Sequence, residues 1–398
     1  MFRGRTVAVA AAFGFAALAV PGVAGAQERE VRISGFGAMT GVVRSFGINS
    51  KAALEAAADQ INKAGGVKLG DGAKGKIVID FLDDRCTAEE GISVVRRIAS
   101  GNAVVAVGPT CSNVAEPLFG VLQKKAGDAS DTGLQFPIFT DVAIKGGLAK
   151  ISEWAFRNVP DESQMYTTLF KWLKATRPEL KTVFGGVEED FAHSRASWHA
   201  IMKVVSAKEG YEVLGESKWL LNDTNFSNQA REAKKANADI IAIAAHPFTT
   251  CGMLKELERQ GVKPKLVIGL TSSSSLETLQ GCAGQAEAII IPTSFAPVNP
   301  QAQAAADAVA KFKGSLDLHS GAAWENVFIL KQIMEEQKVM AKTDTVQADR
   351  EKVRVGLAKL AQTQGLLGVS KRTSDREAVK PYLFVHAKGG KWVVLHTP

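Results

Sequence analysis

The sequence predicts an α/β fold with two Rossmann-like lobes, each built on a parallel central sheet. Short apolar runs alternate along the chain with helical patterns, which is typical of parallel sheets covered by helices. The alternation comes in two successive series of about 130 residues each, the ordinary size of one domain. With 398 residues, 46% of them hydrophobic, the chain is large enough to bury two cores.

The first series contains four strands and three helices. Gly65 and Gly66 end its first helix. Ser112 and Asn113 follow the third strand and are natural N-cap residues, and Glu116 follows Asn113 at the spacing of a capping box. A strand that runs into a helix N-terminus presents unpaired N–H groups, which suit a carboxylate or another polar head group. The expected strands are 31–37, 76–84, 103–107 and 136–141, and the expected helices are 48–63, 88–100 and 118–125.

The second series continues the pattern. Pro292, Pro297 and Pro300 punctuate the stretch from residue 286 onward, so we expect a crossover between lobes there. The Gly389-Gly390 pair predicts the turn of a hairpin within 380–395. The expected strands are 181–187, 210–220, 238–246 and 265–270, and the expected helices are 163–176, 194–209, 228–236, 249–261, 302–313 and 322–336.

Residues 1–26 have the order of regions found in a secretory signal peptide. Arg3 and Arg5 precede an apolar run of 15 residues, and Ala24-Gly25-Ala26 supplies the small residues of a cleavage site. A membrane anchor is the competing interpretation, but the run is shorter than the roughly 20 residues that a span needs. We therefore expect export to the periplasm and cleavage after Ala26.

The charge and the cysteines narrow the class of protein further. The formal net charge of +7 is spread over scattered lysines without a basic stripe, so a nucleic-acid partner is not expected. The four cysteines are free to form disulfides after export. We favour the pairs Cys86–Cys111 and Cys251–Cys282, because the members of each pair follow strand-like runs that would lie side by side. A zinc site is the alternative, but the sequence has no CxxC spacing.

No pattern of catalytic residues stands out. The sequence has no HExxH, no GxSxG and no P-loop, and Thr40 stands where a dinucleotide fingerprint needs its third glycine. Acidic residues cluster at the ends of two strands, where they could act as an acid/base pair or hold a cation. We therefore keep a hydrolase as an alternative, with its acids among Asp83, Asp84, Glu188 and Asp190.

Two exported lobes without catalytic machinery suggest a cleft that closes on a small ligand. Ligands of such sheets bind beyond the carboxyl ends of the strands. In this chain those ends carry hydroxyl, aromatic and other small or polar residues at Thr40 and Phe46, 111–113, 140–144, 188–193, His246-Pro247 and 271–274.

Several ordered segments resemble the type I periplasmic binding proteins, specifically the leucine/isoleucine/valine-binding branch that feeds ABC importers. GAMTG at 37–41 followed by Phe46-Gly47 is similar to the first loop of that family, and AADQINKAGGV at 57–67 to the end of its first helix. DDRC and GPTCS match its two disulfide-bonded segments, and His246-Pro247 and the stretch 321–327 also fit. The likeness covers nearly all of residues 30–398.

The resemblance implies two lobes joined by three crossovers. Lobe 1 is expected to comprise 27–158 and 297–368, and lobe 2 to comprise 159–296 and 369–398. The implied activity is binding without catalysis, and the implied partners are a small ligand and an inner-membrane ABC permease. We expect a monomer with no cofactor, metal ion or catalytic residue.

The resemblance also implies a site. Ser112 lies where the family holds the carboxylate of its ligand, and Phe46 lies where an aromatic ring covers it. The other candidates come from the strand ends and from the aromatic residues. The candidate ligand-binding residues are Phe46, Ser112, Asn113, Asp141, Ala143, Phe191, His246, Thr271 and Trp324.

The sequence departs from the family where an amino acid would place its ammonium group. Thr271 and Ser272 stand in place of the family's glutamate, and a buried ammonium without a counter-charge costs several kcal/mol. Asp141, Glu188 or Asp190 are the candidates for that charge. If none serves, the ligand is an aromatic carboxylate or an amide. A sensor subunit of the same fold is a further alternative to an importer subunit.

Overall fold

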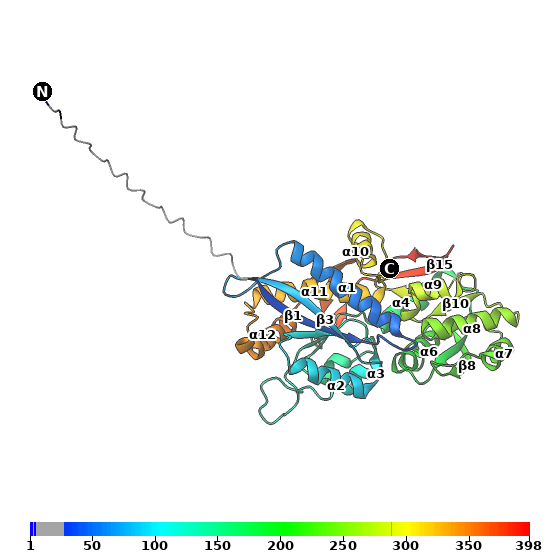
Figure 1. The fold of residues 1–398 in the computed structure, drawn as a ribbon. Helices are drawn as coiled ribbons and strands as arrows, with labels where there is room; N and C mark the ends of the chain where they lie inside the picture. Colours follow the sequence, from blue (N-terminus) through cyan, green and yellow to red (C-terminus); the bar gives the residue numbers. More distant parts are fainter. Residues whose placement is uncertain (3, 5–27, 288) are drawn as a thin grey trace.

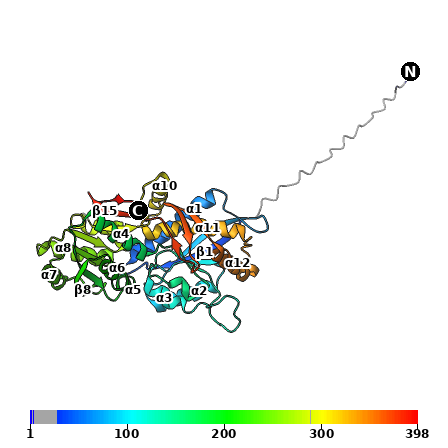
Figure 2. The same cartoon turned by 180° about the vertical axis from the view of Figure 1, so that it is seen from behind.

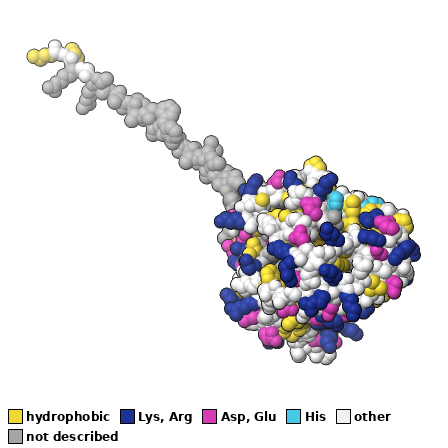
Figure 3. Space-filling view, turned by 90° about the vertical axis from the view of Figure 1, so that its right-hand side faces the viewer, with side chains coloured by type: hydrophobic (Ala, Val, Ile, Leu, Met, Phe, Trp, Pro, Cys, Tyr) yellow, Lys and Arg dark blue, Asp and Glu magenta, His cyan; other side chains and the backbone are white. Residues whose placement is uncertain are grey.

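The computed structural model describes residues 1–2, 4, 28–287 and 289–398. They form two lobes that lie side by side, the first mainly blue, cyan and orange and the second mainly green and yellow (Figure 1). Figure 2 shows both lobes from behind, and Figure 3 shows basic and acidic side chains intermixed on one face. The predicted signal peptide lies outside the described residues, apart from positions 1, 2 and 4. Within the described ranges, no helix combines the length and apolarity of a membrane span.

The first lobe is built on a six-stranded sheet in the order β2-β3-β1-β4-β5-β6. All neighbouring strands are parallel except the edge strand β2, which is antiparallel to β3. The central strand β1 is buried from residue 33 onward, as expected of a parallel strand covered on both faces. The strands are β1 (Arg29–Gly37), β2 (Val67–Lys68), β3 (Lys74–Asp83), β4 (Val105–Val107), β5 (Ile138–Thr140) and β6 (Ala155–Arg157).

Helices cover this sheet, and two of them begin earlier than the sequence pattern predicts. α1 begins at Arg44 instead of residue 48, which places Phe46 in its first turn. Gly47 lies inside this helix and does not interrupt it. A glycine is needed there for packing, because a Cβ would lie 2.1 Å from the Ala38 carbonyl oxygen. α3 begins at Ser112 instead of residue 118. The helices are α1 (Arg44–Lys63), α2 (Ala88–Ala99), α3 (Ser112–Phe119), η1 (Leu148–Ile151), α10 (Pro300–Ala310), α11 (Leu318–Glu336), η4 (Thr343–Thr345) and α12 (Val346–Lys359).

The second lobe is built on a seven-stranded sheet in the order β16-β15-β11-β10-β9-β7-β8. β11 is a strand where the sequence predicted a crossover, and it pairs with β10 and β15 on either side. The predicted hairpin is confirmed: β15 and β16 join at Gly389 and Gly390, both with positive φ, as a tight hairpin turn requires. The strands are β7 (Thr182–Glu188), β8 (Glu212–Trp219), β9 (Ile240–Ala244), β10 (Leu266–Gly269), β11 (Ile290–Thr293), β15 (Leu383–Lys388) and β16 (Lys391–His396).

The helices of the second lobe follow the prediction closely. The expected helix 194–209 is one rod with a π-helical turn in its middle, a feature that often marks functional sites. The helices are α4 (Glu162–Thr176), α5 (Ala192–Ala196), η2 (Ser197–Met202), α6 (Lys203–Lys208), α7 (Ser227–Ala236), α8 (Pro247–Arg259), η3 (Thr271–Ser273) and α9 (Leu276–Cys282).

A small antiparallel sheet precedes the last passage of the chain into the second lobe. Its strands are β12 (Gln362–Gly365), β13 (Gly368–Arg372) and β14 (Ala378–Val379). Arg372 donates to the carbonyl of Arg157, and Arg376 donates to the carbonyls of Ala149 and Ala155. Because these acceptors belong to the first lobe, we propose that the third crossover lies after Val379 and not at 368–369.

Candidate functional site

A small cavity lies between the two lobes, where the carboxyl ends of their strands meet. Its volume of about 10 Å³ is close to the room that one water molecule needs, so the lobes are closed in this structure. The first lobe supplies residues from α1, from α11, from the start of α3 with the loop before it, and from the segment after β5. The second lobe supplies residues from the starts of α5 and α8 and from η3. The lining residues are Phe46, Thr110, Ser112, Val142, Ile144, Phe191, His193, His246, Ser272 and His319.

The first wall is the N-terminus of α3. Its N-cap is Cys111 and no side chain caps it, so the predicted capping box is wrong. The Ser112 hydroxyl instead accepts the backbone N–H of Lys145 at 3.3 Å. No described residue accepts a hydrogen bond from the backbone N–H of Ser112 or Asn113. These two N–H groups and the positive end of the helix dipole thus suit an anionic group.

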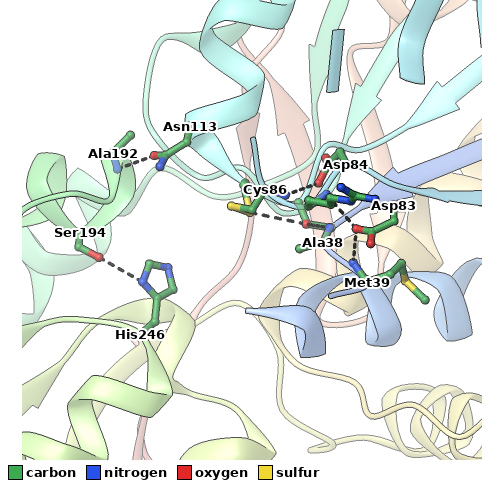
Figure 4. Close-up of a disulfide and its surroundings, with 12 residues drawn as sticks. Ala38, Met39, Asp83, Asp84, Cys86, Asn113, Ala192, Ser194 and His246 are labelled. Atoms are coloured by element: carbon green, nitrogen blue, oxygen red, sulfur yellow. Dashed lines mark hydrogen bonds between the residues drawn. A yellow bond between two sulfur atoms is a disulfide. The ribbon is translucent and has the colours of Figure 1, made fainter. Parts of the chain in front are cut away.

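Asn113 connects the lobes instead of capping the helix. Its Oδ1 accepts the backbone N–H of Ala192, the first residue of α5, at 2.6 Å (Figure 4). The contact spans from the first lobe to the second, and it can form only when the lobes are closed. Asn113 is therefore a contact of the closed state at the rim of the cavity.

Both predicted disulfides are confirmed, with Cα–Cα distances of 5.6 Å for Cys86–Cys111 and 5.3 Å for Cys251–Cys282. The strands that precede Cys86 and Cys111, β3 and β4, were predicted to be neighbours. That prediction is wrong, because β1 lies between them in the sheet. The loop after β3, which carries Cys86 (Figure 4), is joined across the end of β1 to Cys111. The disulfide thus ties the start of α3 to the neighbouring loop.

The second wall contains two buried pairs of histidine and glutamate. Glu188, at the end of β7, accepts the His246 Nδ1–H at 2.5 Å and the His246 backbone N–H at 3.0 Å. Ser194 and Thr249 also donate their hydroxyls to Glu188. Burial alone would raise the pKa of Glu188, but the His246 charge and these hydrogen bonds hold that pKa below its ordinary value. The carboxylate thus lies behind His246 with both oxygens occupied.

The second pair has the same construction. The Oε1 of Glu162 lies 3.0 Å from the His193 Nε2, and Thr271 and Ser197 donate their hydroxyls to the same carboxylate. Ser197 belongs to the π-helical turn. Burial would raise the pKa of Glu162, but the His193 charge and the hydrogen bonds hold that pKa low. Neither glutamate lines the cavity, whereas both histidines do.

A third histidine, His319, faces the cavity from the first turn of α11. It packs edge-on against Phe46 with 5.4 Å between ring centroids. Its Nδ1 is buried and has no hydrogen-bond partner among the described residues. Burial, together with the charges of His193 and His246, lowers the pKa of His319 well below 6.5. The cavity is thus lined by three imidazoles, two phenyl rings and hydroxyl groups, with no carboxylate.

The predicted site residues divide into three groups. Four of them line the cavity: Phe46, Ser112, Phe191 and His246. Four lie beside it without lining it: Asn113 bridges the lobes, Thr271 binds Glu162, and Asp141 and Ala143 are buried next to lining residues. Trp324 packs in the core of the first lobe, 5.5 Å from the ring of Phe328.

Sequence reasoning did not select His319, His193, Thr110 or Ser272 as site residues. His193 and Ser272 lie within strand-end segments that had been singled out, and Thr110 lies directly before one of them. His319 had no such signal, because it comes from a helix far along the chain. Its position follows from the packing of α11 against α1.

The hydrolase alternative can be compared with the geometry. Ser194 and Glu188 both contact the Nδ1 of His246, at 3.2 Å and 2.5 Å. A Ser-His-acid triad needs the serine at the other ring nitrogen. Asp83, at the end of β3, binds the loop after β1 by accepting the Met39 N–H at 2.9 Å (Figure 4). None of the four acids named for a hydrolase lines the cavity.

One group of residues in the second lobe has the composition of a metal site. Ligand atoms of Glu189, His199 and Glu216 lie within 4.8 Å of one another. The Lys218 Nζ lies 2.6 Å from Glu189 and 3.3 Å from Glu216, and the Lys203 Nζ lies 3.0 Å from Glu216. The lysines neutralise the carboxylates, so this group is a surface ion-pair network.

Comparisons with known proteins agree with this architecture. The family model described as "Periplasmic binding protein" matches residues 30–391. The Leu/Ile/Val-binding protein BraC3 of Rhizobium johnstonii is 23% identical over 334 residues, which cover 83% of this chain and 84% of that protein.

Many solved structures share the fold. LivJ of Streptococcus pneumoniae, in complex with isoleucine, has a TM-score of 0.77 at 18% identity, covering 92% of this chain and all of that one. A solute-binding protein of R. palustris in complex with benzoate has a TM-score of 0.77 at 16% identity, covering 92% and 96%. The chain therefore belongs to the periplasmic binding protein family, as its resemblance to the leucine/isoleucine/valine-binding branch predicted.

Proposed function

We propose that the protein is the periplasmic substrate-binding component of an ABC importer, and that its ligand is a small carboxylate with an apolar or aromatic body and no ammonium group. One observation carries the ligand assignment: the interlobe cavity has an anion-binding helix terminus and three histidines but no carboxylate. Family membership supports the substrate-binding role, and the benzoate complex of a structural relative supports the carboxylate ligand.

The polar part of the ligand belongs at the start of α3. Ser112 and the free N–H groups there offer a carboxylate several hydrogen bonds, and protonated His193 or His246 would add a positive charge. Phe46 and Phe191 both pack against His246, with ring centroids 5.7 and 4.2 Å away, and they can enclose an apolar body. The 10 Å³ cavity must widen to admit the ligand, which is the hinge opening expected of two lobes.

An α-amino acid is the second candidate, and Asp141 is the observation that favours it. One oxygen of Asp141 accepts the Ser50 hydroxyl, while the other is buried without a partner among the described residues. An ammonium group that reached this oxygen would be neutralised. Asp141 does not line the cavity in this structure, so this candidate requires a rearrangement of the segment after β5.

The test is a thermal-shift and calorimetric screen of the mature protein against benzoate, 4-hydroxybenzoate, benzamide, leucine and valine. At 100 times Kd, a ligand should add about 2.7 kcal/mol to the free energy of unfolding. We expect stabilisation by a carboxylate and none by leucine or valine. Stabilisation by leucine alone would refute the carboxylate assignment.

Ser112→Ala is the matched site variant. It should weaken carboxylate binding by about 1.5–3 kcal/mol, since it removes a hydrogen bond to a charged group. Ser374→Ala, at an exposed position, is the control and should bind normally. Unchanged affinity in Ser112→Ala would remove Ser112 from the site.

Three further parts of the proposal have separate readouts. We propose that the protein is not an enzyme, so it should return its ligand chemically unchanged. It should elute as a monomer in size-exclusion chromatography with light scattering. Deletion of its gene should abolish uptake of the ligand, whereas a lost signalling response with intact uptake would favour a sensor.

A further inference from the structure

A second, much larger cavity opens next to the one between the strand ends. Its volume is about 850 Å³, within the range of small-molecule sites. The first lobe contributes residues 42–46, 48–49 and 313–315, and the second contributes 224, 226, 246–248, 251–252, 255, 276–277 and 281. Phe46 and His246 line both cavities, and their rings meet edge-on with 5.7 Å between centroids. These two rings thus separate an inner cavity from an outer pocket.

The outer pocket has an apolar lining that remains open to solvent. Phe248 is 49% exposed and Leu276 is 43% exposed, and both come from the second lobe. Val42 and Ile48 from the first lobe are each 36% exposed. Soluble proteins seldom gather large exposed apolar side chains on both sides of one pocket without an occupant for it.

The charges around the pocket favour an anionic occupant. Three basic residues, Arg44, Lys255 and Lys313, line it against one acid, Glu277. Lys255 and Lys313 form no ion pair within the part of the chain that the structure describes. An apolar wall with free cations fits a chain or ring system that ends in a carboxylate.

We propose that the outer pocket is the second half of the ligand site and that the ligand is an elongated dicarboxylate with an apolar middle section. One carboxylate would bind at Ser112 and the start of α3, and the second would meet Lys255 and Lys313. The middle section would pass between Phe46 and His246, whose rings must part when the lobes open. This inference rests on the proposed function, because it takes a carboxylate in the inner cavity as its starting point.

The test compares three probes by calorimetry. Benzoate supplies only the inner head group, nonanoate adds an apolar body, and nonanedioate adds the second acid. We expect nonanedioate to bind tightest, and Lys255→Glu with Lys313→Glu to weaken nonanedioate about tenfold while leaving benzoate within twofold. Lys74→Glu with Lys263→Glu, two exposed reversals outside the pocket with one on each lobe, makes the same change in net charge and should leave all three affinities unchanged.

Each other outcome has a defined meaning. If benzoate binds as tightly as nonanedioate, or if the double variant weakens all three probes equally, the outer subsite is refuted while the carboxylate assignment stands. If the double variant leaves all affinities intact but lowers transport, the pocket is a permease contact and the inference is wrong. If leucine binds and none of the three carboxylates does, the proposed function itself fails.

Discussion

Asp141→Asn tests the electrostatics beside the inner cavity. Asp141 is completely buried after β5, where Ser50 donates a hydroxyl to one of its oxygens. Burial, followed by the nearby charge of Asp317, raises the pKa of Asp141 to about 7 from 3.8. An asparagine keeps the shape and the Ser50 hydrogen bond but cannot ionise.

The magnitude follows from the two pKa values. Because the folded state holds the proton more tightly than the unfolded state, the carboxyl group destabilises the fold as the pH rises from about 4 to about 7. At 1.36 kcal/mol per pKa unit, the loss is about 4 kcal/mol above pH 7, and about 3 kcal/mol of it falls between pH 5 and pH 8. The extra amide donors of asparagine add a cost that does not depend on pH.

The assay is urea unfolding of both proteins at pH 5 and pH 8. Relative to the wild type, Asp141→Asn should gain about 3 kcal/mol between these pH values. Asp307→Asn, on the exposed face of α10, is the control for the chemical change and should show no such gain. A stability difference that is the same at both pH values would refute the argument. Calorimetry on the same variant then tests the amino-acid alternative, which predicts lost leucine binding.

Two further predictions concern the closed state and its histidines. Asn113→Ala removes the interlobe hydrogen bond to Ala192, so it should shift the open–closed equilibrium by about 1 kcal/mol toward the open form. X-ray scattering of the ligand-free protein would detect this shift as a larger radius of gyration. An unchanged radius would contradict the role assigned to Asn113. For His319, the low folded-state pKa means that the unfolded state binds the proton more readily, so the wild type should lose stability as the pH falls below about 6.5. Thermal unfolding at pH 5 and pH 7.5 should show a smaller loss of stability at the lower pH for His319→Gln than for the wild type. If both proteins lose the same stability between these pH values, His319 does not cause the loss.

The architecture could be predicted because its signals are local. The alternation of apolar strands and helices, the Gly389-Gly390 turn and the DDRC and GPTCS segments that carry Cys86 and Cys111 each occupy a short stretch of chain. The errors also have local causes. Prolines near β11 hid a strand that is buried between two neighbours, and the predicted helix start at residue 48 missed the first turn of α1, where Gly47 packs closely against Ala38.

The site was only partly predictable, because local pattern does not report which face of a helix meets the other lobe. Trp324 and His319 lie on the same helix, α11, yet the tryptophan packs in a core while the histidine lines the cavity. Asn113 has the sequence context of a cap, but lobe closure brings Ala192 within hydrogen-bond distance of it. The carboxylates of Glu162 and Glu188 lie behind their histidines because hydroxyls from several elements converge on them.

The sequence alone therefore determined the α/β class, the two lobes, both disulfides and the family, since each depends on periodicity or on ordered motifs along the chain. Only the tertiary structure decided that the interlobe cavity is lined by three histidines and no carboxylate, and that a larger pocket adjoins it. The physical reason is distance along the chain: Phe46, His246 and His319 meet only when helices from both lobes pack against one another.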